Sequence, residues 1–344
     1  MITKTYSQNL KGKNTFGMDV SCRCFIEYDS IADLLELDFE EMLRPVKHIG
    51  GGSNLLFTQD FKGTILHSAV KFIEAVSPDG TAVSVGAGVT FDDFCAWAAE
   101  KGLWGPENLS HIPGEVGASA VQDIGAYGVE VKDIIKTVYS YDTVEEEFVH
   151  FDVSECEYGY RDSFFKKSEN KDRYIITHVV FNLSREAGPR LDYGHLREAV
   201  ERAADGKPVT PELVRETVTA IRRDKLPEPS QTGSAGSFFK NPVVGKDVYD
   251  KVVEIARTLH AEPMEVPHYI VGDMVKIPAA WLIEQCGWKG KRSGNAAVYE
   301  KQPLVIVNAT GRALPEEIVA LEQKVIASVK QKFGITLSPE VEHL

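Results

Sequence analysis

The chain of 344 residues lacks the features that mark several large classes of protein. It has no basic excess, since 38 Lys and Arg stand against 51 Asp and Glu and give a net charge of −13. A general nucleic-acid binder usually carries a basic surplus, so no nucleic acid is expected as a partner, although a few local cations still suffice to bind one small anion. No apolar run approaches the roughly 18 residues of a membrane span, so no membrane partner is expected either.

Cysteine is also scarce and irregularly spaced. The closest two cysteines are too near each other for a CxxC redox motif, and no second pair completes a zinc site. No histidine pair has the HExxH spacing of a zinc enzyme, so the sequence predicts no metal site. The first sixteen residues contain no apolar core of a secretory signal, and unpaired thiols suit a reducing compartment, so we expect a cytoplasmic protein. The cysteines are Cys22, Cys24, Cys95, Cys156 and Cys286.

Neither a P-loop nor a GxGxxG turn that opens a helix occurs, but two glycine-rich loops do. Residues 50–54, Gly-Gly-Gly-Ser-Asn, follow a predicted strand at 46–49. Glycine allows positive φ, so consecutive N–H groups can converge on a phosphate, although a plain surface turn explains this loop equally well. The second loop, at 112–128, combines several glycines with alanines. Small residues pack segments tightly or let the backbone approach a flat ligand, and their density here favours a ligand.

The chain length suggests two or three domains, and the pattern predicts an α+β fold, because strands recur as hairpins rather than in strict βαβ alternation. Thr90 and Asp93 predict a capping box for a helix at 91–101. Leu226-Pro227-Glu228-Pro229 ends another helix and marks a domain boundary. The predicted strands lie at 72–76, 82–85, 138–141, 147–149, 174–183, 304–308 and 335–341. The predicted helices lie at 30–43, 91–101, 211–224, 247–260, 278–286 and 315–333.

Two segments contain residues suited to catalysis. Arg161 can make a bidentate contact with a carboxylate, although a surface pair with Asp162 is the simpler explanation. Ser237 follows small residues that can expose its hydroxyl, and Lys240 and Asn241 come soon after it. A lysine and an amide near a serine can polarise its O–H, although the two phenylalanines between them also explain the segment as a loop that docks on the core.

Three further residues depend on how the chain folds. Lys225 can reach an anion, and Tyr193 lies in a turn-rich segment from which its hydroxyl can close over a ligand. Glu340 lies near the chain end, where a carboxylate is normally solvated. It matters only if the terminal strand folds back toward Ser237, which sequence spacing does not show.

Five motifs occur in order along the chain: GGGSNLLF at 50–57, IPGEVGASAVQDIGAYG at 112–128, YGYRDSFFK at 158–166, KLPEP at 225–229 and GSAGSFFKNP at 233–242. Together they resemble the flavoprotein family of UDP-N-acetylenolpyruvoylglucosamine reductases, also called UDP-N-acetylmuramate dehydrogenases. The resemblance extends from Asn14 to Val341, nearly the whole chain. The segment LDYGHL at 191–196 resembles the longer type of the family, which keeps a tyrosine-bearing loop.

The resemblance implies an α+β FAD-binding region of the PCMH or vanillyl-alcohol-oxidase type, with a smaller C-terminal substrate domain. We expect FAD-binding subdomain 1 at 1–70, joined by the terminal strand at 335–344, subdomain 2 at 71–222 and the substrate domain at 223–334. The resemblance also implies noncovalent FAD, NADPH as electron donor, and reduction of UDP-N-acetylglucosamine enolpyruvate to UDP-N-acetylmuramate, a peptidoglycan precursor. A monomer is expected.

The same resemblance assigns roles to individual residues. Hydride passes from NADPH through FAD to the enolpyruvyl β-carbon, and Ser237 gives a proton to the α-carbon. Arg161 holds the developing enolate, and a protonated Glu340 donates a hydrogen bond to the same carboxylate. Substrate binding falls to Tyr193, Lys225, Lys240 and Asn241. FAD binding falls to Gly50, Gly51, Gly52, Ser53, Asn54, Ile112, Pro113, Gly114, Gly117, Ala118, Ser119, Gly125, Tyr127, Gly128 and Arg222.

Two positions depart from the pattern expected of the family. Asp123 stands where asparagine is expected, which removes an amide donor and adds a charge near the flavin. Glu342 stands where a basic residue is common, which withdraws electrostatic help from Glu340. The alternative is another FAD oxidoreductase of the same fold that acts on a sugar or an alcohol. Such an enzyme needs no proton-donating serine, so the segment around Ser237 speaks against it.

Overall fold

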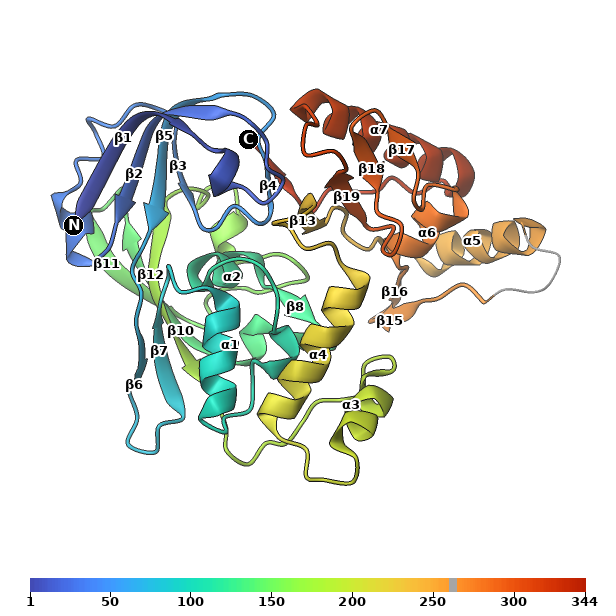
Figure 1. Cartoon of the computed structure of the whole chain (residues 1–344), viewed down its shortest axis with the longest axis horizontal. Coiled ribbons are helices and arrows are strands. Elements are labelled where there is room, and N and C mark those ends of the chain that lie inside the picture. The colour runs from blue at the N-terminus through green and yellow to red at the C-terminus, as the bar shows by residue number, and fades with distance from the viewer. Residues whose placement is uncertain (260–264) are drawn as a thin grey trace. The chain divides into compact units, whose positions relative to one another are not determined.

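The computed structural model describes residues 1–259 and 265–344 (Figure 1). They form two compact units, each assembled from separate stretches of the chain. Unit 1 comprises Met1–Asn9, Ser21–Gly52 and Phe61–Asp224, and unit 2 comprises Leu10–Val20, Ser53–Asp60 and Lys225–Leu344. The three-segment division expected from the sequence stays a prediction. None of the helices in the described part of the chain combines the length and apolar character that crossing a membrane requires.

Unit 1 contains a four-stranded sheet in the order β1-β2-β5-β3. Strand β1 runs antiparallel to β2, whereas β5 pairs in parallel with both β2 and β3. A side chain at Gly63 in β5 would lie 1.9 Å from the carbonyl oxygen of Pro45, so only glycine allows the chain to cross there. The bounds are β1 (Ile2–Asn9), β2 (Ser21–Tyr28), β3 (Val46–Ile49) and β5 (Phe61–Ser68).

Unit 1 also contains a five-stranded antiparallel sheet in the order β11-β10-β12-β7-β6. Its central strand is rich in isoleucine and valine, which suit a buried pleated surface. The predicted hairpins β6–β7 and β10–β11 and the predicted strand at 174–183 are confirmed. The bounds are β6 (Ile73–Ala75), β7 (Ala82–Gly86), β10 (Ile135–Asp142), β11 (Glu147–Asp152) and β12 (Tyr174–Asn182).

Helices α1 (Phe91–Glu100) and α2 (Val116–Gln122) pack on this second sheet. Phe94 of α1 stacks on Phe181 of β12 with ring centroids 4.5 Å apart. The predicted helix at 91–101 is thus confirmed, but its capping box is wrong. The hydroxyl of Thr90 bonds to the carboxylate of Asp93, so it does not cap the backbone N–H groups of the helix.

A shared apolar cluster joins the two sheets of unit 1. Tyr28 and Leu66 come from the first sheet, Tyr141 and Ile175 come from the second, and all four are buried. Helices α3 (Leu196–Ala204) and α4 (Pro211–Lys225) add a smaller cluster around Trp104. Helix α4 confirms the predicted helix at 211–224. Its last residue, Lys225, is the first residue after the boundary between the two units.

Unit 2 contains a four-stranded sheet in the order β13-β19-β18-β17 and a three-stranded sheet in the order β14-β16-β15, both antiparallel. The strands are β13 (Gly233–Ser237), β14 (Val243–Val244), β15 (Tyr269–Val271), β16 (Met274–Lys276), β17 (Arg292–Ser293), β18 (Ala296–Val298) and β19 (Val305–Asn308). The helices are α5 (Lys246–Leu259), α6 (Ala279–Gln285) and α7 (Pro315–Phe333). These helices confirm the predictions at 278–286 and 315–333, while the predicted end of α5 at His260 lies outside the described residues.

Two sequence predictions of local structure are wrong. Only the short 3-10 helix η2 (Ala32–Glu36) forms where a helix at 30–43 was expected, and the Asp38 side chain accepts the N–H groups of Glu40 and Glu41 beyond it. No strand forms at 335–341, where one was expected; the strand β20 (Glu342–His343) follows that segment and pairs in parallel with β4 (Leu55–Leu56). Pro339 has no N–H to donate to a strand ladder, so it limits that pairing. The remaining short elements are η1 (Lys11–Lys13), η3 (Glu107–Leu109), β8 (Gly125–Ala126), β9 (Val129–Glu130), η4 (Val131–Asp133) and η5 (Phe164–Lys166).

Candidate functional site

The two glycine-rich loops come together in unit 1, although they are far apart in the sequence. A side chain at Gly50 would lie 3.1 Å from Cβ of Ala118 and 3.2 Å from Oε2 of Glu115. A side chain at Gly51 would lie 3.9 Å from Cα of Gly114. Gly52 has a φ of +64°, which the loop needs in order to turn away from the sheet. Gly51 and Ala118 are exposed, so the loops present bare backbone and small side chains to a ligand.

His67 of β5 fixes the second loop to the first sheet. Its Nε2 lies 3.0 Å from Oε1 of Glu115, and its Nδ1 lies 2.8 Å from Oε2 of Glu27 in β2. Burial lowers the pKa of His67, but the hydrogen bonds and charges of the two carboxylates outweigh burial and raise it above its ordinary value. The imidazole therefore connects the sheet to the residue that touches Gly50. Sequence analysis missed this contact, because nothing in the spacing of these residues indicates it.

We expect His67→Phe to destabilise the protein most at acidic pH. The variant leaves the largely buried Glu115 carboxylate without its imidazole partner, and an unpartnered buried group costs on the order of 1–3 kcal/mol. Because the pKa of His67 is raised in the folded protein, its stabilisation is complete below about pH 6.5 and is lost as the pH rises through the raised value. We expect the difference in melting temperature between wild type and variant, measured by thermal unfolding across this range, to shrink toward alkaline pH.

His178→Phe is the matched control for this experiment. His178 of β12 stacks on Tyr139 with ring centroids 4.3 Å apart, no described carboxylate pairs with it, and burial lowers its pKa. Its contribution to stability is therefore present at high pH and lost as the pH falls below about 6.5, the opposite direction to His67. The same pH trend in both variants would contradict the role given to His67.

The N–H groups at the start of α2 are used inside the protein. The N–H of Val116 donates to the carbonyl of Val89 at 2.9 Å, and the N–H of Gly117 donates to the carbonyl of Ala87 at 3.0 Å. A side chain at Gly117 would lie 2.9 Å from Cβ of Ala87, so this packing requires glycine. The hydroxyl of Ser119 donates to the carbonyl of Val116 at 2.7 Å. Gly117 and Ser119 therefore shape the loop. Because the N–H of Gly117 and the hydroxyl of Ser119 already donate within the protein, any contact of these residues with FAD must use other atoms, and that contact stays a prediction.

Arg222 of α4 approaches the beginning of the same loop. Its Nε donates to the carbonyl of His111 at 3.1 Å, next to Ile112 and Pro113. No described carboxylate forms an ion pair with Arg222, and burial lowers the pKa of its guanidinium. The charges of Tyr127 and Asp92 oppose this decrease only in part, and a buried cation of this kind favours an anionic ligand. The structure thus brings Arg222 beside the glycine-rich loop, and its contact with FAD stays a prediction.

Tyr193, the predicted substrate-binding tyrosine, lies over the end of this loop. Its ring meets that of Tyr127 edge-to-face, with centroids 6.1 Å apart. A side chain at Gly128 would lie 3.4 Å from Cβ of Tyr193. Asn108 holds the two segments together, because its Nδ2 donates to the carbonyls of Tyr127 and Arg190 at 3.0 and 2.8 Å. Tyr193 itself is 45% exposed, which suits a residue that contacts a ligand from solvent.

Arg161 is held by the backbone of the turn that follows α2. Its Nη1 donates to the carbonyl of Asp123 and its Nη2 donates to the carbonyl of Gly125, each at 2.8 Å. A side chain at Gly125 would lie 2.9 Å from Nη1, so glycine makes room for the guanidinium. The ion pair with Asp162 that the sequence left open as an explanation is not among the described contacts of Arg161. Two backbone carbonyls thus fix the direction of the guanidinium.

Ser237 and Glu340 are brought onto neighbouring segments of unit 2. Ser237 ends β13 after a bulge at Gly236, whose φ is +67°. The chain then runs antiparallel to the terminal segment: Phe239 bridges to Pro339, and the N–H of Glu340 donates to the carbonyl of Phe238 at 2.8 Å. The terminal segment therefore does fold back toward Ser237, which is the condition that sequence spacing left undecided.

The structure describes contacts for some of the residues that the sequence places around Ser237. No hydrogen bond joins the hydroxyl of Ser237 to Lys240, Asn241 or any other residue that the structure describes. The Asn241 side chain instead caps α6, because its Oδ1 accepts the N–H of Ala279 at 2.8 Å. Lys225 is exposed at the end of α4. Polarisation of the serine by Lys240 and Asn241 and the substrate contacts of these residues stay predictions.

Asn54 connects the first glycine-rich loop to the terminal segment within unit 2. Its Nδ2 donates to the carbonyl of Glu340 at 3.2 Å, and its own carbonyl accepts the N–H of Glu342 at 3.0 Å. The first glycine-rich loop is therefore divided between the units: Gly50–Gly52 belong to unit 1, whereas Ser53 and Asn54 belong to unit 2. The structure gives Asn54 a role that the motif alone did not reveal: it positions the backbone that carries Glu340.

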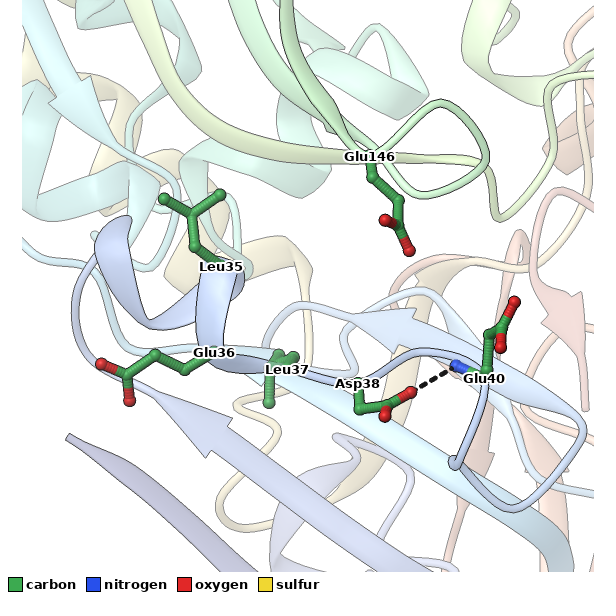
Figure 2. Close-up of a pocket in the computed structure, with 6 residues that line it drawn as sticks. All are labelled: Leu35, Glu36, Leu37, Asp38, Glu40 and Glu146. Carbon is green, nitrogen blue, oxygen red and sulfur yellow. Dashed lines mark hydrogen bonds between the residues drawn. The ribbon is translucent and has the colours of Figure 1, made fainter.

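A separate hollow in unit 1 is lined by carboxylates and does not suit the expected ligands. Figure 2 shows Asp38 accepting the N–H of Glu40 at 3.0 Å, with Glu146 facing them from another segment. An acidic lining repels phosphates and carboxylates. In the parts of the chain at 1–259 and 265–344, no group of three or more His, Cys, Asp or Glu side chains is placed to hold a metal ion. The residues around this hollow are Leu35, Glu36, Leu37, Asp38, Glu40 and Glu146.

Comparison with known proteins finds two family models that match separate parts of the chain. A family model described as "FAD binding domain" matches residues 29–147. A model described as "UDP-N-acetylenolpyruvoylglucosamine reductase, C-terminal domain" matches residues 228–344, which contain Ser237 and Glu340. The glycine-rich loops fall within the first match and the paired segments of unit 2 fall within the second.

Curated relatives and a solved structure are similar over nearly the whole chain. The chain is 49% identical over 340 residues to the UDP-N-acetylenolpyruvoylglucosamine reductase of Bacteroides fragilis strain YCH46, covering 98% of each chain. It is 43% identical over 342 residues to that of Porphyromonas gingivalis strain W83, covering 97% of each. The crystal structure of UDP-N-acetylenolpyruvylglucosamine reductase from Thermus caldophilus matches 100% of this chain and 98% of its own, with a TM-score of 0.68 at 20% identity. The expected α+β fold, an FAD-binding region of the PCMH type with a C-terminal domain, is confirmed.

Proposed function

We propose that this chain reduces UDP-N-acetylglucosamine enolpyruvate to UDP-N-acetylmuramate with NADPH. The premise is that the chain belongs to the UDP-N-acetylenolpyruvoylglucosamine reductase family of FAD-containing oxidoreductases. The product is a precursor of peptidoglycan. The observation that carries the proposal is the antiparallel pairing that places the segment of Ser237 beside that of Glu340.

The residues of unit 1 fit FAD. The loops around Gly51 and Gly114 approach each other through bare backbone, and side chains there would fill the space that a flat cofactor or its pyrophosphate needs. Arg222 adds a largely buried cation beside these loops, and Asp92 compensates it only in part, which suits a diphosphate. We therefore assign the FAD to this part of unit 1 and propose that it is held noncovalently.

Bound FAD supplies the redox chemistry, the acceptance of hydride from NADPH and its delivery to the β-carbon of the enolpyruvyl double bond. The protein must supply the proton that the α-carbon takes, and we assign this proton to the hydroxyl of Ser237. Its position after the bulge at Gly236 leaves the hydroxyl without a hydrogen-bond acceptor among the described residues, so it can turn toward a substrate. A serine is a weak acid in water, so a water-excluded site and a developing negative charge on the substrate must favour the transfer.

Arg161 and Glu340 are assigned to the charge that develops next to the substrate carboxylate. The two carbonyls that hold the Arg161 guanidinium fix its direction before reaction, so little reorganisation is needed when the enolate forms. Glu340, in its protonated form, can donate a hydrogen bond to the same carboxylate. Tyr193, Lys225, Lys240 and Asn241 are proposed to bind the UDP sugar, the first two at its diphosphate.

The proposal is tested by visible absorption under anaerobic conditions. The purified protein should show a flavin band that bleaches when NADPH is added and returns when UDP-N-acetylglucosamine enolpyruvate is added. Return of the colour requires both hydride transfer to this substrate and delivery of the proton. The product should be identified as UDP-N-acetylmuramate by mass spectrometry.

Two other outcomes would contradict the proposal. If the reduced protein ignores the enolpyruvyl substrate and regains colour only in air, the chain is a different flavin oxidoreductase. If no flavin band forms even after incubation with FAD, the glycine-rich loops serve packing alone. NADH in place of NADPH is the matched control for the electron donor.

A further inference from the structure

A buried ion pair lies next to the turn that holds Arg161. Asp123 follows α2 in the left-handed conformation, with φ 51° and ψ 65°, and its side chain is 0% exposed. Lys132 of η4 donates two hydrogen bonds to this carboxylate. Its backbone N–H donates to Oδ1 and its Nζ donates to Oδ2, each at 3.3 Å. The lysine also pairs with Glu130. A fully buried carboxylate is thus balanced by one cation, on an element that follows it in the chain.

The backbone of the same aspartate accepts Arg161. The guanidinium donates to the carbonyls of Asp123 and Gly125, so a shift of this turn moves the guanidinium with it. Lys166 fastens the other side, because its Nζ lies 2.9 Å from the carbonyl of Arg161 and 2.6 Å from Oε1 of Gln122. Arg161 is therefore oriented by a turn whose own geometry depends on the buried side chain of Asp123.

We propose that Lys132 is a positioning residue for Arg161, acting by neutralising the buried carboxylate of Asp123 in the turn that holds the guanidinium. The idea rests on the proposed function, in which Arg161 stabilises the enolate. An aspartate fits this buried turn only while a cation neutralises it, because an ionised carboxylate without a partner is costly to bury. Lys132 supplies that cation, so the lysine controls a guanidinium that it does not itself touch.

The electrostatics of the turn support this coupling. Burial raises the pKa of Asp123, with Glu130 adding to the increase, and Lys132 opposes it by its charge and its hydrogen bonds. Other charged or titratable groups near the turn are Arg161, on the carbonyl of Asp123, Lys166, on the carbonyl of Arg161, and Tyr158, whose buried hydroxyl is influenced by the aspartate. Removing the lysine therefore leaves Asp123 ionised and unbalanced at high pH, and protonated and neutral at lower pH.

The test is a double-mutant cycle of Lys132→Met and Asp123→Asn. We expect K132M to slow reoxidation by the enolpyruvyl substrate by roughly ten- to a hundredfold, the scale of a mispositioned catalytic group, while reduction by NADPH is unchanged. The loss should fall on kcat more than on KM and should lessen as the pH is lowered. D123N alone should stay close to the wild type, and D123N/K132M should recover the D123N rate, because an amide needs no counter-charge.

The control variant is Lys136→Met, an exposed lysine on neighbouring β10, which should match the wild type. Thermal unfolding of all variants gives a second readout: we expect the melting temperature of K132M to be lowered and that of the double variant to be restored. A K132M rate equal to that of the wild type, or a double variant no faster than K132M, would overturn the proposal. Coupling in thermal stability without coupling in reoxidation would reduce the pair to a structural one and overturn its positioning role. If wild type is not reoxidised by the substrate at all, the proposed function fails instead.

Discussion

Ser237→Ala should leave flavin reduction by NADPH unchanged and slow reoxidation by the enolpyruvyl substrate by roughly 10²–10⁴-fold, the range typical of a lost general acid. The first half-reaction needs no proton from this residue, whereas the second must deliver one to the α-carbon. The hydroxyl carries no hydrogen bond to a described residue, so its removal breaks no hydrogen bond within the described part of the protein. Stopped-flow absorption at the flavin band separates the two half-reactions directly.

A matched control and an isotope measurement make this test specific. Ser230→Ala removes an exposed serine hydroxyl seven positions earlier in the chain and should leave both half-reactions intact. Wild type in deuterated water should show a solvent isotope effect on reoxidation if proton delivery contributes to the rate. Reoxidation of S237A at the wild-type rate would exclude Ser237 as the proton donor.

Arg161→Met should slow reoxidation by roughly 10²–10³-fold, the cost of removing one preorganised donor from a developing oxyanion. The guanidinium is aimed by the carbonyls of Asp123 and Gly125, so the wild-type enzyme has the charge in position before the reaction begins. Methionine keeps much of the length of the side chain but has no charge. The measurement is single-turnover reoxidation at saturating substrate, which isolates the chemical step from binding.

Two companion variants separate charge from geometry in this prediction. Arg161→Lys keeps the charge but loses the fork that reaches both carbonyls, so it should recover only part of the rate. Arg185→Met removes an exposed arginine whose Nη1 also donates to a backbone carbonyl, that of Lys101 at 3.0 Å, and should be silent. If R161M and R185M are equally active, Arg161 holds its loop and has no catalytic role.

Local sequence signals predicted most of the regular structure. Helix α7 has its predicted bounds because its apolar residues recur at helical spacing after Pro315. The hairpins of the second sheet follow from alternating apolar residues on either side of a turn. The helix expected at 30–43 failed because Asp38 captures backbone N–H groups that a helix would use, a local competition that apolar spacing does not reveal.

The motifs also indicated the candidate residues of the site, but not how the fold assembles them. The five motifs indicated the family, the cofactor and the candidate catalytic residues, and the comparisons confirm the family. In the sequence, Asp123 in place of the expected asparagine indicated the loss of an amide donor and the gain of an unbalanced charge. The structure shows Lys132 against it, so the charge is compensated by a residue that no motif marked.

The sequence by itself determined where backbone must be bare, where most helices and hairpins lie, and which side chains are candidates for the chemistry. These properties depend on each residue and its near neighbours, since φ, periodicity and side-chain type are local. Only the tertiary structure decided that the terminal segment lies against the Ser237 segment and that His67 ties Glu115 to the first sheet. Such contacts join residues distant in the chain, and they are selected by the burial and hydrogen bonding of the whole fold, which no single motif contains.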